Sequence, residues 1–224
     1  MMMSLFSMFD PSAAFNMPLN WMIMILTILM IPLQFWMNKS RISNFFNMML
    51  KSLHKEFSAL FTKTILMKGS TLMPITLFIM IFLNNISSNF PYNFCSSAHL
   101  SFSMSLSIPI WMSIILFFWM NLTKTMLSHL VPTGTPNMLM PLMVLIELTS
   151  NIIRPMALAV RLTANLIAGH LLMALLGNTM NITSIYWPMI MLIQTMFLMF
   201  ELMVAIIQSY VFSVLMTLYS SEIY

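Results

Sequence analysis

The sequence predicts an all-α membrane protein, and three observations lead to this fold class. Of the 224 residues, 60% are hydrophobic and only 6% are charged, whereas soluble domains carry roughly 25% charged residues. The mean hydropathy is +0.91. Apolar segments long enough for a helix to cross a hydrocarbon core of about 30 Å recur along the chain. We therefore expect residues 1–224 to form a single membrane domain.

The first part of the chain predicts four helices. Residues 18–37 predict an N-terminal transmembrane helix, because they are mostly apolar and of spanning length. Residues 39–63 predict an amphipathic helix at the membrane surface. Its apolar stripe recurs at three- and four-residue steps, at Phe45, Met49, Leu53, Phe57 and Leu60. Residues 71–90 and 100–122 are again apolar and predict a membrane hairpin.

Basic residues gather between the first and second predicted spans. They are Lys39, Arg41, Lys51, Lys55, Lys63 and Lys68. The positive-inside rule assigns this loop to the matrix or cytoplasmic side, and the N-terminus to the opposite side. The clustering favours a topology signal over a nucleic-acid site, so no nucleic-acid partner is expected. The single cysteine, Cys95, excludes an intrachain disulfide and a cysteine-rich metal site.

The last part of the chain predicts two long helices, over residues 137–176 and 188–220. A helix of about 40 residues would measure about 60 Å, twice the hydrocarbon thickness. We therefore expect both helices to be strongly tilted, with Pro155 as the natural bend in the first. The polar break from Gly177 to Ser184 indicates that the two helices form an antiparallel hairpin.

Both long helices carry polar side chains at helical spacing. The first has Glu147, Asn151, Arg154, Arg161 and Asn165, and the last has Gln194, Glu201, Gln208 and Glu222. A polar packing seam would explain the amides, but it is a poor explanation for two arginines and three carboxylates. Ionisable side chains are costly at membrane depth, and where they occur they indicate an ion or substrate path.

One antiparallel register would align three polar pairs between the long helices: Arg161 with Gln208, Glu147 with Glu222, and His170 with Glu201. Such pairs suit two separate proton passages on either side of a fixed cation, because the Arg161 guanidinium stays protonated. A carboxylic acid on a moving partner would cross lipid protonated and release its proton near Arg161. His170 follows Arg161 by nine residues, about 180° around an ideal helix, so it lies on a different face unless Gly169 or a local distortion turns it.

Two motifs resemble the subunit a family of F-type ATP synthases, in its animal mitochondrial form: RPMALAVRLTANLIAGH and FELMVAIIQSYVF. The resemblance extends over essentially the whole chain and includes HLVPTGTP. It implies a non-catalytic, proton-translocating stator subunit without a cofactor. Its partners would be a rotating ring of c subunits and other membrane-sector and peripheral-stalk subunits.

The resemblance also implies roles for individual residues and a location. Arg161 would face the c-ring with Gln208 as its neighbour. An inlet half-channel would contain His170 and Glu201, and an outlet half-channel Glu147 and Glu222. The family implies the mitochondrial inner membrane, with the N-terminus towards the intermembrane space and the C-terminus towards the matrix.

Several alternatives stay open from the residues alone. A secondary transporter would use Arg161 to bind an anionic substrate, although such folds usually have internal repeats and glycine-broken helices, and neither is seen in the sequence. Asn84 and Asn85 indicate either hydrogen bonds between helices or a channel lining. Arg154 favours a structural role, paired with Glu147 or with a neighbouring chain. Asn151 and Gln194 are likewise assigned a structural or secondary role.

Overall fold

The structure is a computed structural model that describes residues 5–12, 18–31, 40–61, 69–90, 93–131, 134, 136, 138–179 and 186–222. Within these ranges the regular structure is entirely helical. Four of the described helices are long and apolar enough to cross a membrane. They are α3 (Leu72–Asn89), α4 (Leu100–Asn121), α6 (Met140–Asn178) and α7 (Trp187–Glu222). The chain is therefore a multi-pass helical membrane protein.

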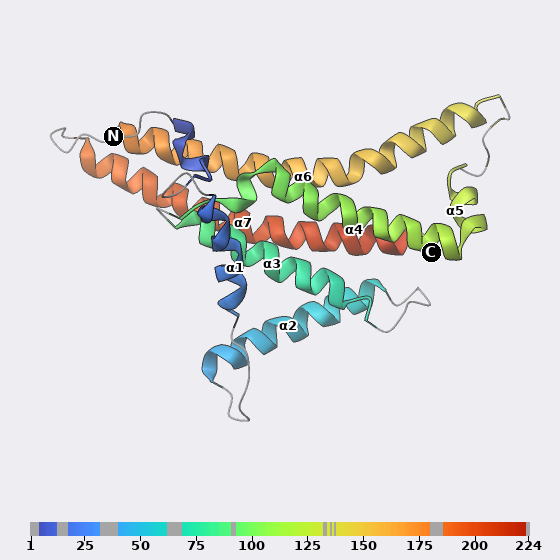
Figure 1. The fold of residues 1–224 in the computed structure, drawn as a ribbon, viewed down its shortest axis with the longest axis horizontal. Helices are drawn as coiled ribbons and strands as arrows, with labels where there is room; N and C mark the ends of the chain where they lie inside the picture. The colour runs from blue at the N-terminus through green and yellow to red at the C-terminus, as the bar shows by residue number, and fades with distance from the viewer. Residues whose placement is uncertain are drawn as a thin grey trace.

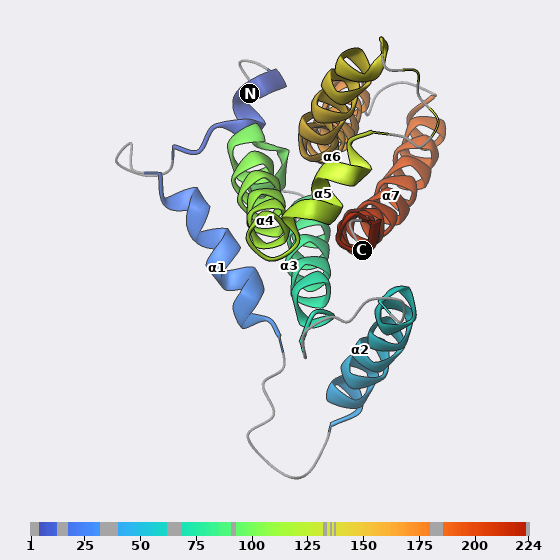
Figure 2. The ribbon, with the colours of Figure 1, turned by 90° about the vertical axis from the view of Figure 1, so that its right-hand side faces the viewer.

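The four long helices pack around one buried apolar cluster. Helices α6 and α7 run antiparallel along the long axis of the molecule, while α3 packs against α7 and α4 against α6 (Figures 1 and 2). The cluster takes side chains from each of α3, α6 and α7, including Leu77, Ile81, Leu158, Leu162, Leu166, Phe212 and Met216. This packing fixes α6 against α7, the two helices that carry most of the polar candidates.

Helix α6 continues through Pro155 for 39 residues. At 1.5 Å per residue it measures about 58 Å, longer than the hydrocarbon core is thick. Pro155 has no N–H to donate to the carbonyl of Asn151, which removes one hydrogen bond from the middle of the helix. Figure 1 shows α6 bent along its length rather than straight.

The predicted first span is represented by a short helix. Helix α1 (Met22–Leu29) follows a 3₁₀ turn, η3 (Leu19–Trp21), and residues 32–37 of the predicted span lie outside the described part of the chain. The buried side chain of α1 is Thr27, whose Oγ1 lies 2.7 Å from Oδ1 of Asn84 on α3. One of the two predicted roles of Asn84, a hydrogen bond between helices, is therefore present.

Helix α2 (Arg41–Leu60) begins where the Ser40 hydroxyl accepts a hydrogen bond from the Ser43 N–H. Its apolar stripe is buried in one part and exposed in another. Leu53 and Phe57 are buried against α3, whereas Phe45, nearer the start of α2, is 64% exposed. The exposed turns therefore extend beyond the packed body, as Figure 1 shows.

The connections contain three further short helices. A 3₁₀ helix, η1 (Leu5–Phe9), lies near the N-terminus, and another, η4 (Ser96–Ala98), lies between α3 and α4. Helix α5 (Thr123–His129) overlaps residues 124–136, a segment in which the proline, glycine and threonine residues of HLVPTGTP predict a loop. The break in this connection comes later, at Gly134, whose φ of +101° is favourable for glycine only.

We expect Thr27→Val to weaken the attachment of α1 to α3 by about 1 kcal/mol, because it leaves the buried Asn84 amide without its partner. Retention of the chain in heated detergent-solubilised complexes would measure this loss. Thr27→Ser keeps the hydroxyl and should behave like the wild type. Equal thermal stability of the valine and serine variants would contradict the assigned role of this hydrogen bond.

Candidate functional site

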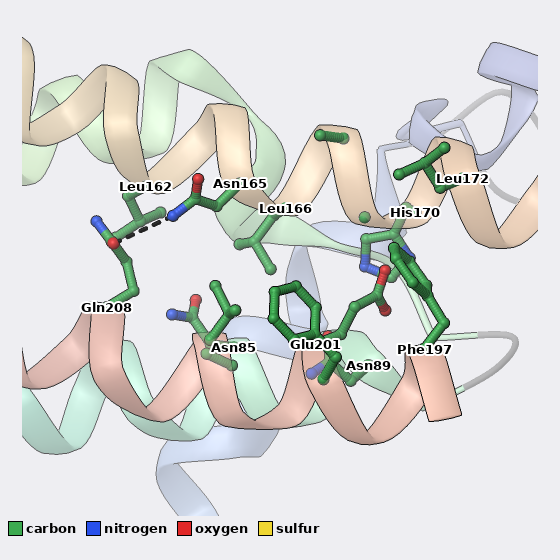
Figure 3. A pocket seen from close by; sticks show the side chains of 15 residues that line it. Asn85, Asn89, Leu162, Asn165, Leu166, His170, Leu172, Phe197, Glu201 and Gln208 are labelled. Atoms are coloured by element: carbon green, nitrogen blue, oxygen red, sulfur yellow. Dashed lines mark hydrogen bonds between the residues drawn. The ribbon is translucent and has the colours of Figure 1, made fainter. Parts of the chain in front are cut away.

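A polar cavity of about 340 Å³ lies between α6, α7 and α3 (Figure 3). Its polar lining comes from all three helices: Asn165 and His170 on α6, Glu201 and Gln208 on α7, and Asn85 and Asn89 on α3. Apolar residues such as Leu162, Leu166 and Phe197 complete the wall. The cavity therefore brings together four amide side chains, an imidazole and the Glu201 carboxyl group inside the membrane-spanning part of the chain.

The Glu201 side chain reaches this cavity because α6 has a glycine opposite it. Figure 3 shows the carboxyl group extending from α7 towards His170 on α6. A Cβ added at Gly169 would collide with Oε1 of Glu201 and lie 2.9 Å from its Cδ. Gly169 therefore leaves the space that the Glu201 carboxyl group occupies beside His170.

Several buried polar atoms of the cavity have no hydrogen-bond partner among the described residues. They are Nε2 of His170, Oε1 of Glu201, and both amide side-chain atoms of Asn85 and of Asn89. Buried polar groups are rarely left unpaired in proteins, and water molecules satisfy them where a polar cavity is large enough. A volume of about 340 Å³ can hold several water molecules at about 30 Å³ each. The geometry suits a hydrated proton path.

Asn89 was not predicted as a site residue, and Asn85 was predicted to have one of two roles. The two residues are four positions apart, so they occupy the same face of α3. This spacing was the available signal. That the face turns towards α6 and α7 depends on the packing of α3 against α7, which no local pattern specifies.

Gln208 has a different partner from Arg161, the residue that the antiparallel register in the sequence predicts. It is 7% exposed, and its Oε1 accepts a hydrogen bond of 3.2 Å from Nδ2 of Asn165. Asn165 lies one helical turn beyond Arg161, the predicted partner. Both side chains are exposed on α6, but Asn165 lines the cavity and reaches Gln208, whereas Arg161 does neither.

Arg161 stands apart from the cavity. Its side chain is exposed on α6, and among the described residues it forms no ion pair or hydrogen bond. His170, nine residues later, is half-buried in the cavity wall. The expected difference of about 180° between the two positions agrees with their different surroundings. The chain thus presents a fixed cation outwards, beside a cavity that contains an acid and an imidazole.

A second cavity, of about 480 Å³, lies between α4, α5, α6 and the end of α7. Glu147, Asn151 and Arg154 of α6 line it together with Tyr219 of α7. Nη2 of Arg154 lies 4.0 Å from Oε1 of Glu147, and the Arg154 guanidinium lies 5.1 Å from the centre of the Tyr219 ring. Arg154 therefore has the structural partner that the sequence suggests, reinforced by a cation–π contact.

Two remaining candidates are not brought into these sites. Gln194 is half-buried on α7 but lines neither cavity. The backbone of Glu222 is the last helical position of α7, and its side chain lies outside the described part of the structure. Within the described ranges no three histidine, cysteine, aspartate or glutamate side chains gather in a way that could hold a metal ion.

Comparisons with known proteins match the chain over nearly its full length. Residues 17–221 match the family described as ATP synthase A chain. The chain is 51% identical to ATP synthase subunit a of Locusta migratoria over 226 residues and 51% identical to that of Drosophila melanogaster over 224 residues. It is 52% identical to ATP synthase subunit a of Aedes albopictus over 230 residues. Each alignment covers 100% of both proteins.

The α6–α7 register can be tested with cysteine pairs in a Cys95→Ser background. We expect a short thiol cross-linker to join Asn165→Cys to Gln208→Cys several-fold more efficiently than Arg161→Cys to Gln208→Cys. One helical turn displaces the second pair by about 5.4 Å along the axis. Gel mobility of the cross-linked chain is the measurement, and a preference for the second pair would contradict the observed register.

Proposed function

The chain belongs to the ATP synthase A chain family and is therefore a membrane-sector subunit that takes part in proton transport and ATP synthesis, and from this premise we propose how it acts. Two offset half-channels deliver protons to, and collect them from, carboxyl groups on a rotating ring of c subunits. Arg161 separates the half-channels and prevents a direct leak. The observation that carries this proposal is the exposed, unpaired guanidinium of Arg161 beside the Glu201 cavity.

The charge of Arg161 calls for a partner outside this chain. A guanidinium does not deprotonate in proteins, and an unpaired charge at membrane depth is costly. Among the described residues no carboxylate pairs with it. An ionised carboxylate on the c-ring would remove this cost whenever it stands opposite Arg161. The same carboxyl group would enter lipid only after protonation, because an unpaired carboxylate in hydrocarbon is also costly.

Helices α6 and α7 expose apolar side chains as well as the Arg161 guanidinium. Exposed apolar side chains on α6 and α7 include Ile153, Met156, Val160, Leu172, Met196, Met203 and Ile207. Lipid tails could cover such a surface, but they could not neutralise Arg161. A protein partner that offers both apolar side chains and an acid fits the whole face, and a ring of c subunits has this chemistry.

The outer half-channel is the cavity that contains His170 and Glu201. An imidazole and a carboxyl group can each take up and release a proton, and water bound by Asn85 and Asn89 would connect them. Asn165 and Gln208 lie at the end of the cavity nearer Arg161 in sequence, and their hydrogen bond closes the seam there. Protons would therefore leave the cavity next to Arg161 and would not continue between the two helices past it.

The inner half-channel is the cavity that contains Glu147 and Asn151. Glu147 is paired with Arg154, which would hold the carboxylate at the cavity wall. Glu222, at the far end of α7, would complete this route towards the matrix. The two cavities lie on opposite sides of Arg161 along α6, since one is lined by residues 147–154 and the other by residues 162–172.

A secondary transporter accounts less well for these features. An anion-binding arginine would be expected inside a central cavity, but Arg161 lines neither cavity and faces outwards. The proposal further assigns ATP chemistry to other subunits. It assigns the chain to the mitochondrial inner membrane, with its N-terminus towards the intermembrane space and its C-terminus towards the matrix. The six basic residues between Lys39 and Lys68 support this orientation.

We predict that Arg161→Ala lowers ATP-driven proton pumping by more than about 100-fold, equivalent to about 2.7 kcal/mol at the barrier. Acidification of vesicles that contain the assembled complex would measure this. The complex should still assemble, because Arg161 has no partner within the described chain. Arg41→Ala, at an exposed arginine on α2, serves as the matched control and should pump normally. Preserved pumping in Arg161→Ala would refute the proposed function.

We also predict that Gly169→Ala slows pumping by about tenfold, which corresponds to about 1.4 kcal/mol. The new methyl group would push the flexible Glu201 side chain out of its place beside His170, while the helices stay packed. Gly177→Ala is the control on the same helix, because a Cβ there meets nothing within 4 Å. Pumping rates per assembled complex decide the matter, and equal rates for the two variants would rule out the positioning role of Gly169.

A further inference from the structure

The N-terminal helix η1 packs on the outside of α6 at the level of the Glu201 cavity. Figure 1 shows η1 beside the second half of α6. Phe9, the last residue of η1, is half-buried and packs against the central apolar cluster, whereas Phe6 on the same turn is 67% exposed. Of the two phenylalanines of η1, Phe9 is therefore the one that packs towards α6.

Phe9 meets the imidazole of His170 edge-on. The two ring centres are 6.4 Å apart and the ring planes are inclined by 87°. This separation and angle are typical of favourable edge-to-face aromatic pairs. No hydrogen bond from the described residues holds the His170 ring, and its Nε2 is buried. The plane of the imidazole therefore depends on packing, and the Phe9 ring is one of the aromatic groups beside it, with Phe197 of α7 on the cavity side (Figure 3).

The segment that carries Phe9 is itself attached to the outer connections. Nδ2 of Asn20 donates a hydrogen bond of 3.4 Å to the carbonyl oxygen of Asp10, the residue after Phe9. Trp21 in turn packs against His99 and Phe94, with ring centres 5.3 and 5.7 Å away. These contacts join η1 to the connection between α3 and α4. Phe9 is therefore held from two sides and does not rest on His170 alone.

We propose that Phe9 is a positioning residue for proton uptake: η1 packs on α6 beside the cavity, and the Phe9 ring keeps the His170 imidazole facing Glu201. This inference rests on the proposed function of the outer half-channel. It adds the N-terminal segment, which lies more than 100 residues before α6 in the sequence, to the parts that determine the rate of proton uptake. The contact requires an aromatic ring and not merely apolar volume.

The test compares variants in the assembled complex. We expect Phe9→Leu to lower ATP-driven acidification per complex by about three- to tenfold, because the bulk remains but the ring edge is lost. Phe9→Tyr keeps the ring and should restore pumping to within about twofold of the wild type. Phe6→Leu, at the exposed position of η1, should leave it unchanged. Diethyl pyrocarbonate should modify His170 faster in Phe9→Leu than in the wild type, as followed by mass spectrometry.

Each of the following results would overturn the inference. They are normal pumping and normal His170 modification in Phe9→Leu, equal losses in the leucine and tyrosine variants, or loss of assembly with a normal rate per remaining complex. Failure of both Phe9 variants to assemble would also overturn it in favour of a folding role. Arg161→Ala separates this inference from the proposed function. If that variant pumps, the proposed function fails; if it is inactive while Phe9→Leu pumps normally, only the role of Phe9 fails.

Discussion

The cost of a permanent positive charge within a membrane is the constraint on which this structure depends. Arg161 can neither lose its proton nor find a carboxylate among the described residues. The described residues therefore leave this charge without a counter-charge, and the Arg161 side chain is exposed on α6. In the proposed mechanism, a carboxylate of the partner subunits neutralises this charge, so the energy of this subunit depends on which partner group stands opposite Arg161.

In the proposed mechanism, the antiparallel pairing of α6 and α7 lets this single charge separate two half-channels. Both helices are longer than the membrane is thick, so each can reach polar side chains from two different depths. The cavity at residues 162–172 and the cavity at residues 147–154 lie on either side of Arg161 along one helix. A shorter, upright helix could not carry two such cavities and an arginine between them. The length of the helices and the offset of the cavities are therefore linked.

Much of the helical framework was predictable, because crossing the hydrocarbon core takes about 17 to 25 apolar residues and the four long helices, from α3 with 18 residues to α6 with 39, all provide this length. The side-chain pairing was less predictable. The predicted register pairs residues of α6 and α7 whose numbers add up to a nearly constant sum, which treats α6 as straight and ignores side-chain length. In the structure α6 is bent, and Gln208 forms a hydrogen bond with the short side chain of Asn165. Asn89 and Phe9 escaped notice because their importance comes from α3 and η1 packing on helices distant in sequence. Seven residues at α5 are too few for periodicity to be distinguished from a loop.

In the proposed outer half-channel, neutral amides suit proton transfer better than further titratable groups would. Every additional carboxyl group or histidine there would titrate, and a strong proton acceptor would hold the proton instead of passing it on. Asn85 and Asn89 offer donors and acceptors that never change charge, so they can bind water while leaving Glu201 and His170 as the groups that exchange protons. The rate then depends on how these two groups face each other. Gly169 and Phe9 act on that arrangement from opposite sides, one by leaving space and the other by filling it.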